Sequence, residues 1–337
     1  MKHIPEQIRF DGKVAVITGA GRGVGRSYAE LLAARGAKVV VNDLGVTTAG
    51  TIGTEASGSV AQEVAAAIAA NGGEAVADTH SVVEEAGAIV DAAVRQWGRL
   101  DIVINNAGIS GGGGLDEIPV EDYEQMVNVH YLGAVRVLRA AWPHLVSSGG
   151  GRVVNTSSTS IFGMAGTSHS ISAKAGVFGL TRALAEEGRA TGVVVNSVLP
   201  TAWTRLTRQI PDDNFAAWLE ATCPPDLVAP FVAWLCSAEV PFSGEAFAVG
   251  GGRVARVFLG ESSGVVHHNP APESYRDVAE QLIGTAGFRV PANTVEEIMF
   301  FAAEIGNAAA AATSATAAGT ATPNPEPGSW AEHAKTS

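Results

Sequence analysis

The sequence has few cysteines, little positive charge and no long hydrophobic run, and each shortage excludes a class of protein. Cys223 and Cys236 are the only cysteines among 337 residues. They are too few for a disulfide framework and lack a zinc-ligand pattern, so we expect buried free thiols and no bound metal. The net charge of −12, without a basic run, argues against a nucleic-acid partner. No apolar run has the length of a membrane span and residues 1–13 hold no apolar leader, so we expect a cytoplasmic protein without a membrane partner.

What is present is a regular alternation of short β-branched runs with amphipathic, helix-length segments. Continuous apolar strands interleaved with helices indicate a parallel sheet that is covered on both faces. We therefore predict an α/β fold with a doubly wound, seven-stranded parallel sheet of the Rossmann type. The expected strands are residues 14–18, 38–43, 74–77, 101–106, 152–157, 193–198 and 245–250. The expected helices are residues 24–35, 59–71, 84–97, 121–146, 171–191 and 227–237.

The composition changes towards the C-terminus and predicts three parts. The Rossmann-type domain is expected over residues 1–262. A helical extension follows over 263–307, because "ESYRDVAEQLI" and "NTVEEIMFFAAEIGNA" both have the pattern of short helices. The remainder, 308–337, is rich in Ala, Thr, Pro and Gly and has almost nothing to bury, so we predict a disordered tail.

One stretch, "VAVITGAGRGVGRSYAELLAARGAKVVVNDLG" at residues 14–45, predicts a dinucleotide site. A strand, a glycine cluster and a helix follow one another, which lets the backbone approach a pyrophosphate at the free N–H groups of the helix N-terminus. Asp43 ends the next strand, where a carboxylate can accept both adenosine ribose hydroxyls and would repel a 2′-phosphate. Arg22 lies within the glycine cluster and could pair with a 2′-phosphate, although it also fits a solvated loop cation. We predict NAD as the cofactor in preference to NADP.

Three motifs together resemble the short-chain dehydrogenase/reductase family over residues 8–262. They are Thr18-Gly19-x-x-x-Gly23-x-Gly25, Asn105-Asn106-Ala107-Gly108, and a serine on the fifth strand with Lys174 beyond it. Within that family, "VVVNDLG", "VAPFVAWLCS" and "FAVGGGRVARV" are similar to the (3R)-hydroxyacyl-CoA dehydrogenase domains of peroxisomal multifunctional enzymes of type 2. The resemblance implies hydride transfer between a nicotinamide and a secondary alcohol or ketone.

The resemblance also assigns catalytic positions, and one of them departs from the family. The family's general acid is a Tyr with a Lys four residues later, and Lys174 matches that Lys. Ser170 stands in the Tyr position, one helical turn away on the same face. A serine hydroxyl is a far weaker acid than a phenol and ends roughly 4 Å short of the phenol oxygen. A direct replacement is therefore excluded, and a water would have to relay the proton.

Two further catalytic positions follow from the same comparison. The family's substrate-orienting serine falls on Ser158 when counted from the strand, and on Ser157 when counted back from the helix. We choose Ser158 because the segment "TSSTSIFG", between the strand and the helix, is one residue shorter than the family's usual spacing. The family's relay Asn falls on His130, which we expect to pass protons because histidine titrates near neutrality.

Cofactor contacts are implied by position as well. His80 replaces an Asp that touches the adenine amino group in the family, and backbone groups around Pro200 and Trp203 should meet the nicotinamide carboxamide. The predicted cofactor-binding residues are Gly19, Arg22, Gly23, Val24, Gly25, Asp43, His80, Ser81, Asn106, Ala107, Gly108, Lys174, Pro200 and Trp203.

The substitution at Ser170 leaves several functions open. The first is an NAD-dependent oxidoreductase in which Ser170, His130 and Lys174 relay a proton through water. The alternatives are a non-redox dehydratase or isomerase, a nucleotide-binding pseudoenzyme subunit, and a Tyr-to-Ser variant of an ordinary dehydrogenase. The expected substrate is a hydrophobic hydroxyacyl thioester or an alicyclic or steroid-like alcohol under a lid at 201–226. A homodimer or homotetramer is expected through segments 121–146 and 171–191.

Overall fold

The computed structural model describes residues 7–50, 59–209, 212–267, 271–284 and 287–317. Contacts between residues divide the chain into two compact units, Met1–Val257 and Phe258–Ser337. The first unit contains the predicted sheet and is described first, and the second unit is described separately.

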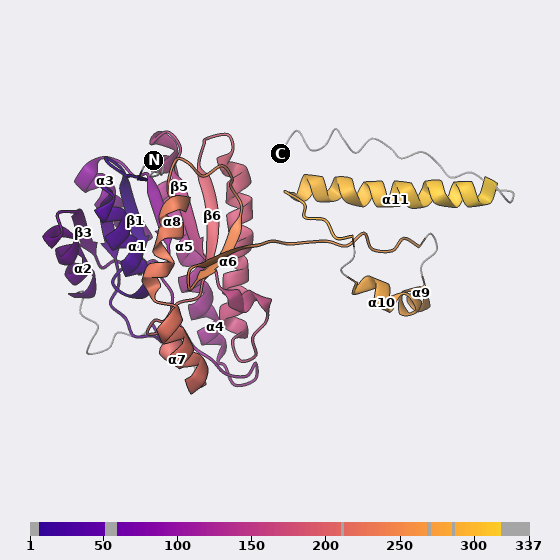
Figure 1. The fold of residues 1–337 in the computed structure, drawn as a ribbon, viewed down its shortest axis with the longest axis horizontal. Helices are drawn as coiled ribbons and strands as arrows, with labels where there is room; N and C mark the ends of the chain where they lie inside the picture. The colour runs from indigo at the N-terminus through magenta and orange to yellow at the C-terminus, as the bar shows by residue number, and fades with distance from the viewer. Residues whose placement is uncertain (1–6, 51–58, 210–211, 268–270, 285–286, 318–337) are drawn as a thin grey trace, which may run out of the picture. The chain divides into compact units, whose positions relative to one another are not determined.

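The first unit is built on one sheet of eight strands in the order β3-β2-β1-β4-β5-β6-β7-β8 (Figure 1). The seven predicted strands pair in parallel, and the order reverses direction between β1 and β4. The prediction lacked β8, which pairs antiparallel with β7 after a two-glycine turn. Gly251 and Gly252 have φ of 56° and 78°, the positive values that a tight hairpin turn needs. The strands are β1 Val14–Thr18, β2 Lys38–Asn42, β3 Glu74–Asp78, β4 Ile102–Asn105, β5 Arg152–Thr156, β6 Val194–Pro200, β7 Ala246–Gly250 and β8 Arg253–Val257.

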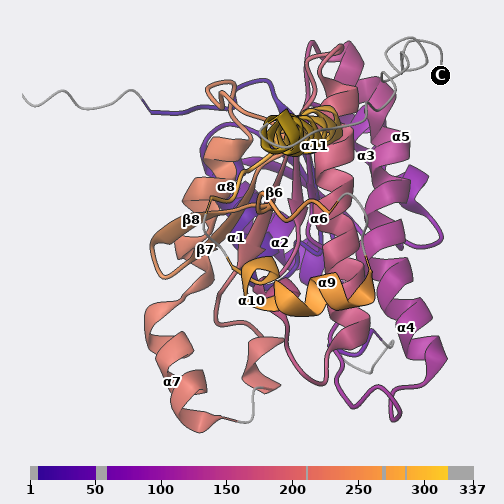
Figure 2. The same cartoon turned by 90° about the vertical axis from the view of Figure 1, so that its right-hand side faces the viewer.

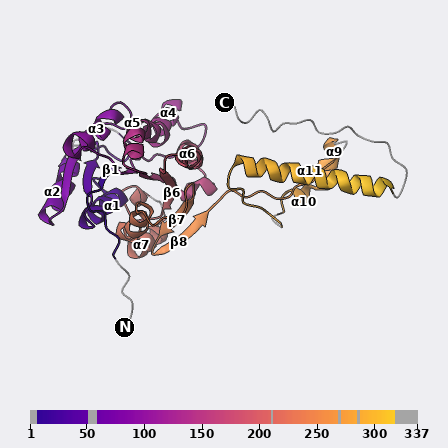
Figure 3. The ribbon, with the colours of Figure 1, turned by 90° about the horizontal axis from the view of Figure 1, so that it is seen from above.

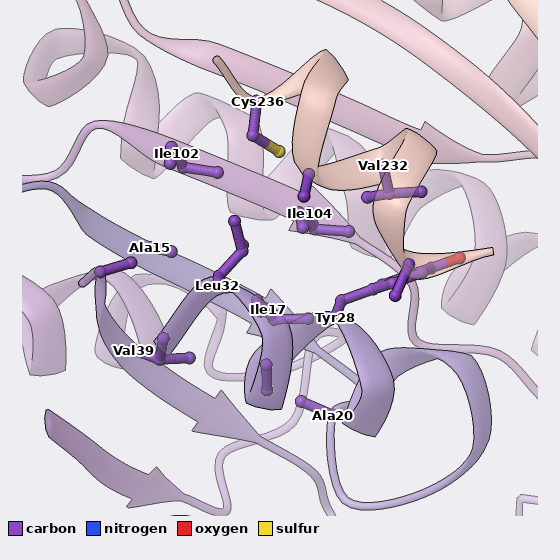
Figure 4. Close-up of a cluster of buried hydrophobic side chains, with 14 of the residues drawn as sticks. Ala15, Ile17, Ala20, Tyr28, Leu32, Val39, Ile102, Ile104, Val232 and Cys236 are labelled. Atoms are coloured by element: carbon purple, nitrogen blue, oxygen red, sulfur yellow. The ribbon is translucent and has the colours of Figure 1, made fainter. Parts of the chain in front are cut away.

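Helices cover both faces of this sheet, as its continuous apolar strands require. Helices α1, α2 and α8 bury one face, and α3, α5 and α6 bury the other. Figure 2 shows α5 and α6 on the side of the strands opposite to α8, and Figure 3 shows them on the side opposite to α1. In Figure 4, Leu32 and Tyr28 of α1 pack with Ile17, Ile104 and Val232 in the core of the first face. The helices are α1 Gly23–Ala34, α2 Ser59–Ala70, α3 Ala86–Trp97, α4 Val120–Met126, α5 Gly133–Ser147, α6 Ser168–Gly188, α7 Asp213–Thr222 and α8 Ala229–Leu235.

The long helix predicted over 121–146 is interrupted. Between α4 and α5 the backbone forms a π-helix, η1 Val127–Leu132, with its wider turn. Its only buried residue is His130, and η1 packs against α6. The interruption therefore sets the rotation of His130 relative to the sheet, which hydrophobic periodicity could not reveal.

Buried polar side chains fix α6 against the centre of the sheet. The Asn105 amide of β4 donates to the Asn155 side-chain oxygen of β5 at 2.9 Å. The Asn155 amide in turn donates to the Thr181 hydroxyl of α6 at 3.1 Å, and that hydroxyl donates to the Val177 carbonyl. Because buried polar groups need partners, this chain of hydrogen bonds restricts where α6 can lie.

The second unit contains α9 Pro272–Asp277, α10 Ala279–Leu282 and α11 Thr294–Ala317. The two predicted helical segments are thus present, with the first divided at Val278. Helix α11 continues to Ala317, beyond residue 308 where we expected a disordered tail to begin. Alanine has the highest helix propensity, so the alanine-rich start of that segment prolongs the helix. The rest of the predicted tail lies outside the described residues.

A buried carboxylate joins the starts of β1 and β4 and gives a test of this fold. Asp101 accepts hydrogen bonds from the Val14 amide and from the Lys13 and Arg99 side chains, at 2.6–3.0 Å. Burial alone would raise the pKa of Asp101, but the bonds from Arg99, Val14 and Lys13 hold it below its usual value. A lowered pKa means that the ionised carboxylate stabilises the fold above its unfolded pKa, and that this contribution is lost as pH falls through the folded pKa.

Asp101→Asn should lower the free energy of unfolding at neutral pH by about 2 kcal/mol, because bonds to a charged buried acceptor are lost. The difference in the free energy of unfolding between wild type and Asp101→Asn should shrink in acid. Urea unfolding at neutral and at acid pH measures this difference. Asp11→Asn is the matched control, since its exposed carboxylate also pairs with an arginine, Arg9, and should not matter. Equal unfolding midpoints for wild type and Asp101→Asn at neutral pH would contradict the prediction.

Candidate active site

The candidate site lies where the strand order reverses, at the carboxyl ends of β1 and β4. In open parallel sheets this crevice is where ligands bind. A cavity of about 820 Å³ opens there, with walls from the segments after the strands β1 to β6. That volume is in the range of cofactor and ligand sites.

The turn after β1 contains glycines at positions where any side chain would collide with the neighbouring backbone. Gly19 has φ of 64°, and a Cβ there would lie 2.8 Å from the Ala107 Cα atom. A Cβ on Gly25 would lie 2.3 Å from the Gly19 carbonyl oxygen. The Asn106 amide donates to the carbonyls of Thr18 and Gly19 at 3.1 and 3.0 Å, which ties this turn to the turn after β4. The backbone is therefore held open to a ligand at the N-terminus of α1.

Asp43 follows β2 and is buried beside the glycine turn. Its carboxylate oxygens accept from the Gly21 and Gly45 amides at 2.9 and 2.8 Å. These bonds orient the carboxylate, and each oxygen keeps a lone pair that can accept from a ligand hydroxyl.

His80 follows β3 and lines the same cavity. Its Nδ1 lies 2.7 Å from the Asp78 carboxylate, which also accepts from the Asn42 amide. Because Asp78 is a buried acceptor, Nδ1 carries the proton of this hydrogen bond.

Most of the predicted site residues line this cavity. Those that do are Gly19, Arg22, Gly23, Val24, Asp43, His80, Ser81, Asn106, Ala107, Gly108, His130, Ser158, Ser170, Lys174 and Pro200. Gly25 and Trp203 are not among the lining residues in the described part of the chain. Gly25 packs behind the turn, against the Gly19 carbonyl. The Trp203 backbone amide donates to the Cys223 carbonyl at 2.7 Å, so this N–H group already has a hydrogen-bond partner within the chain.

Lys174 is the buried cation of the site. Its ammonium donates to the Thr156 carbonyl at the end of β5, at 2.7 Å. Burial lowers the pKa of Lys174 to about 8. An ammonium has further donors, so Lys174 can hold a second partner in the cavity.

The two candidate serines after β5 have different roles in the fold. The Ser157 hydroxyl is buried and donates to the Lys174 carbonyl at 2.9 Å, so its proton is committed. The Ser158 hydroxyl accepts from the Ser160 amide and hydroxyl, at 3.1 and 2.8 Å. Ser158 therefore both caps the turn and keeps its own proton free to donate into the cavity.

Ser170 lies one turn before Lys174 on α6 and is half-buried. Its hydroxyl makes no hydrogen bond within the described part of the chain, whereas Ser158 and Lys174, which line the same cavity, are both bonded. His169, its neighbour, is buried against the Tyr123 ring and does not line the cavity among the described residues. Of these two residues, Ser170 is the one that lines the cavity.

His130 differs from its expected behaviour. Burial, followed by the positive charge of Lys174, lowers the pKa of His130 well below its usual value, so the ring is neutral near pH 7 rather than titrating there. Its Nε2 accepts from the Ile109 amide at 2.9 Å, which puts the proton on Nδ1. We therefore assign the ring a neutral donor in place of the expected ionising relay.

Behind His130 lies a second, small cavity of about 10 Å³, roughly the space that one water molecule needs. Lys174 also lines it. Three of its lining residues carry a buried polar atom that has no hydrogen-bond partner in the described chain: Asn105 Oδ1, His130 Nδ1 and Thr156 Oγ1. Such a group of unpaired atoms is suited to bind one water.

The sequence reasoning missed part of the cavity wall. Thr204, Arg205, Leu206 and Thr207 line it from the segment after β6. That segment was predicted only as a substrate lid. The signal was present, because residues just after a parallel strand face the ligand crevice.

In residues 7–317, leaving out the gaps, no group of three His, Cys, Asp or Glu side chains could hold a metal ion. No described helix is long and apolar enough to cross a membrane.

Comparison with known proteins agrees with this geometry. Residues 13–214 match the family model for short chain dehydrogenases. A short-chain type dehydrogenase/reductase of Mycobacterium tuberculosis is 41% identical over 79% of this chain and 91% of its own length. The mouse peroxisomal multifunctional enzyme type 2 is 39% identical over 86% of this chain, which spans only 39% of that enzyme.

A solved structure adds a cofactor to the comparison. Carveol dehydrogenase from Mycobacterium avium, determined in complex with NAD, superposes with a TM-score of 0.65 at 30% identity. The likeness covers 72% of this chain and 97% of that one. The reversal of strand order, the glycine turn and the matched relatives lead to one conclusion: the chain belongs to the short-chain dehydrogenase/reductase family of oxidoreductases.

Proposed function

We propose that this chain transfers a hydride between NAD and a secondary alcohol or ketone on a hydrophobic substrate such as a hydroxyacyl thioester. The observation that carries the proposal is the buried ammonium of Lys174, on the wall of the cavity that the glycine turn also lines. A buried cation is costly unless it has partners, so its retention at this point favours a catalytic or cofactor-binding role.

The cofactor supplies the hydride chemistry, and residues of the chain orient the substrate and transfer the proton. When bound, NAD supplies the hydride acceptor and NADH the donor. Ser158 donates its free proton to the substrate oxygen and orients it. Lys174, held by the Thr156 carbonyl, presents its other donors to the cofactor ribose. Ser170 is too short to reach the substrate oxygen, so a water between them takes or gives the proton.

The small cavity behind His130 offers a second place for a water, which Lys174 lines and Ser170 does not. A water bound by Asn105 Oδ1, His130 Nδ1–H and Thr156 Oγ1 would lie beside the ammonium. His130 then acts as a fixed donor rather than as a base. Loss of a positioned general acid typically costs about 10²- to 10⁴-fold in rate, so we propose a slow enzyme.

The substrate class is proposed from the cavity mouth and the relatives. Met164 and Leu206 line the cavity, and the side chain of Phe162, two residues before Met164 at the end of the short helical turn Thr159–Phe162, is exposed. Phe215 and Trp218 of α7 stack with ring centroids 5.7 Å apart and are half-exposed. These apolar surfaces favour a hydrophobic substrate. Relatives of this chain include peroxisomal multifunctional enzymes and a 3-oxoacyl-[acyl-carrier-protein] reductase, in keeping with an acyl thioester.

The preference for NAD rests on Asp43. Asp43→Asn should weaken NADH binding about tenfold, because the charged acceptor of the ribose hydroxyls is lost, and should leave NADPH binding unchanged or tighter. Titration by NADH and NADPH fluorescence measures both affinities. Asp91→Asn, on the exposed face of α3, is the matched control and should change neither. An unchanged ratio of the two affinities in Asp43→Asn would remove the assignment.

The relay through Ser170 has a direct test. Ser170→Tyr should raise turnover by about 10²-fold, because the ring restores a general acid one turn from Lys174. Lys174→Ala should abolish activity in both backgrounds. NADH formation from a panel of secondary alcohols and hydroxyacyl thioesters is the assay.

Ser172→Tyr is the control for this test, because it adds the same ring on the exposed side of α6. It should leave turnover unchanged. If Ser170→Tyr lowers activity instead, the cavity serves non-redox chemistry or a larger substrate. If neither form is active, the nucleotide-binding subunit is the better account.

We also propose a homodimer or homotetramer that pairs through α5 and α6. Leu132, Val135 and Leu180 leave apolar surface partly exposed on η1, α5 and α6. Light scattering at micromolar concentration should give a mass of two or four chains, whereas the mass of one chain would refute the pairing. The cytoplasmic location expected from the sequence remains a prediction, since several relatives are named as peroxisomal.

A further inference from the structure

Two arginines from distant segments converge on one carbonyl oxygen at the wall of the large cavity. Arg22, in the glycine turn, donates to the Val46 carbonyl at 3.3 Å. Arg205, in the segment after β6, donates to the same oxygen at 2.8 Å. Both side chains are half-buried and both line the cavity. A carbonyl is a weak partner for two guanidinium groups, each of which has several further N–H donors.

The charges around this pair are not balanced. Neither guanidinium forms an ion pair within the described part of the chain. Burial, followed by the charge of Arg22, lowers the pKa of Arg205, whereas Asp43 acts in the opposite direction. The Asp43 oxygens already accept from the Gly21 and Gly45 amides. One carboxylate therefore faces two cations, and a further anion would relieve their repulsion.

The position of the pair indicates what that anion is. The Thr204 side chain covers the glycine turn, since a Cβ on Gly23 would lie 3.2 Å from the Thr204 methyl group. Arg205 follows directly, so the segment after β6 and the glycine turn face each other across the place where we propose that the dinucleotide lies. The charged groups that a dinucleotide carries in this place are phosphates, which arginine binds with paired N–H donors.

We propose that Arg22 and Arg205 form a two-arginine clamp for a phosphate of the bound cofactor. The inference rests on the proposed function, because it assumes that the cavity binds a dinucleotide. The Val46 carbonyl holds both side chains at the wall of the cavity. Binding exchanges this carbonyl for phosphate oxygens and draws residues 204–207 onto the cofactor. Arg205 is thus a cofactor-positioning residue supplied by the substrate lid.

Two phosphates could be the ligand. The pyrophosphate is common to NADH and NADPH, whereas the 2′-phosphate belongs to NADPH alone. Arg205→Met should weaken both dinucleotides about 10- to 100-fold if the clamp holds the pyrophosphate, and NADPH alone if it holds the 2′-phosphate. Arg22→Met should act in the same direction, and Arg205→Lys should recover part of the loss because it restores a charge without the paired donors.

The experiment measures dissociation constants for NADH and NADPH by fluorescence at several salt concentrations, together with thermal unfolding of each variant. Removing a phosphate contact should also reduce the salt dependence of binding. Arg26→Met is the control, because Arg26 lies one turn from Arg22 and pairs with Glu30 on the exposed side of α1. It should bind both dinucleotides as wild type does.

Three outcomes separate the inference from the proposal beneath it. Wild-type affinity and salt dependence in a stably folded Arg205→Met protein would overturn the clamp while leaving the proposed function intact. Adenosine has no phosphate. If Arg205→Met weakens adenosine binding as much as dinucleotide binding, the clamp is also overturned, because Arg205 then has a purely structural role. If wild type binds neither dinucleotide, the proposed function fails, and inorganic pyrophosphate then tests the clamp alone. If wild type binds inorganic pyrophosphate and Arg205→Met does not, the anion site is retained. If wild type does not bind pyrophosphate, the anion site is overturned.

Discussion

The junction of α6 with β5 is the constraint on which the candidate site depends. The Lys174 ammonium donates to the Thr156 carbonyl, and the Ser157 hydroxyl donates back to the Lys174 carbonyl. A buried ammonium without a partner would be strongly destabilising, so these two bonds fix the register of the helix against the strand. Ser170 is then carried to the cavity one turn away. The side chain that α6 brings to the cavity there is the short hydroxyl of a serine.

The parts of the fold that follow local rules were predictable from the sequence. The centres of β1 and β2, "VAVI" and "VVV", are continuously apolar because both faces of the sheet are covered, and the strands occur where they were expected. The glycine turn was equally clear, because its spacing reflects contacts within one strand–turn–helix unit. Even there, periodicity could not tell that Gly25 packs behind the turn rather than lining the cavity.

The remaining features depend on contacts between distant segments. Arg22 and Arg205 meet at Val46 only because β1 and β6 carry their turns to the same edge of the sheet. The π-helix around His130 breaks a sequence pattern that is otherwise helical, and burial then removes the titration that His130 would show in water. None of these features has a local signature in the sequence. The environment of His130 depends on the packing of α6, and the meeting of Arg22 with Arg205 depends on a turn far along the chain.

The antiparallel strand β8 has a consequence for how copies of this chain can associate. It forms one edge of the sheet, and two of its five residues are Arg253 and Arg256. Both are exposed, and Arg256 pairs with Glu245 beside it. Charged residues on an edge strand oppose the addition of a further strand from another molecule. Growth of the sheet by strand addition at the β8 edge is thereby disfavoured.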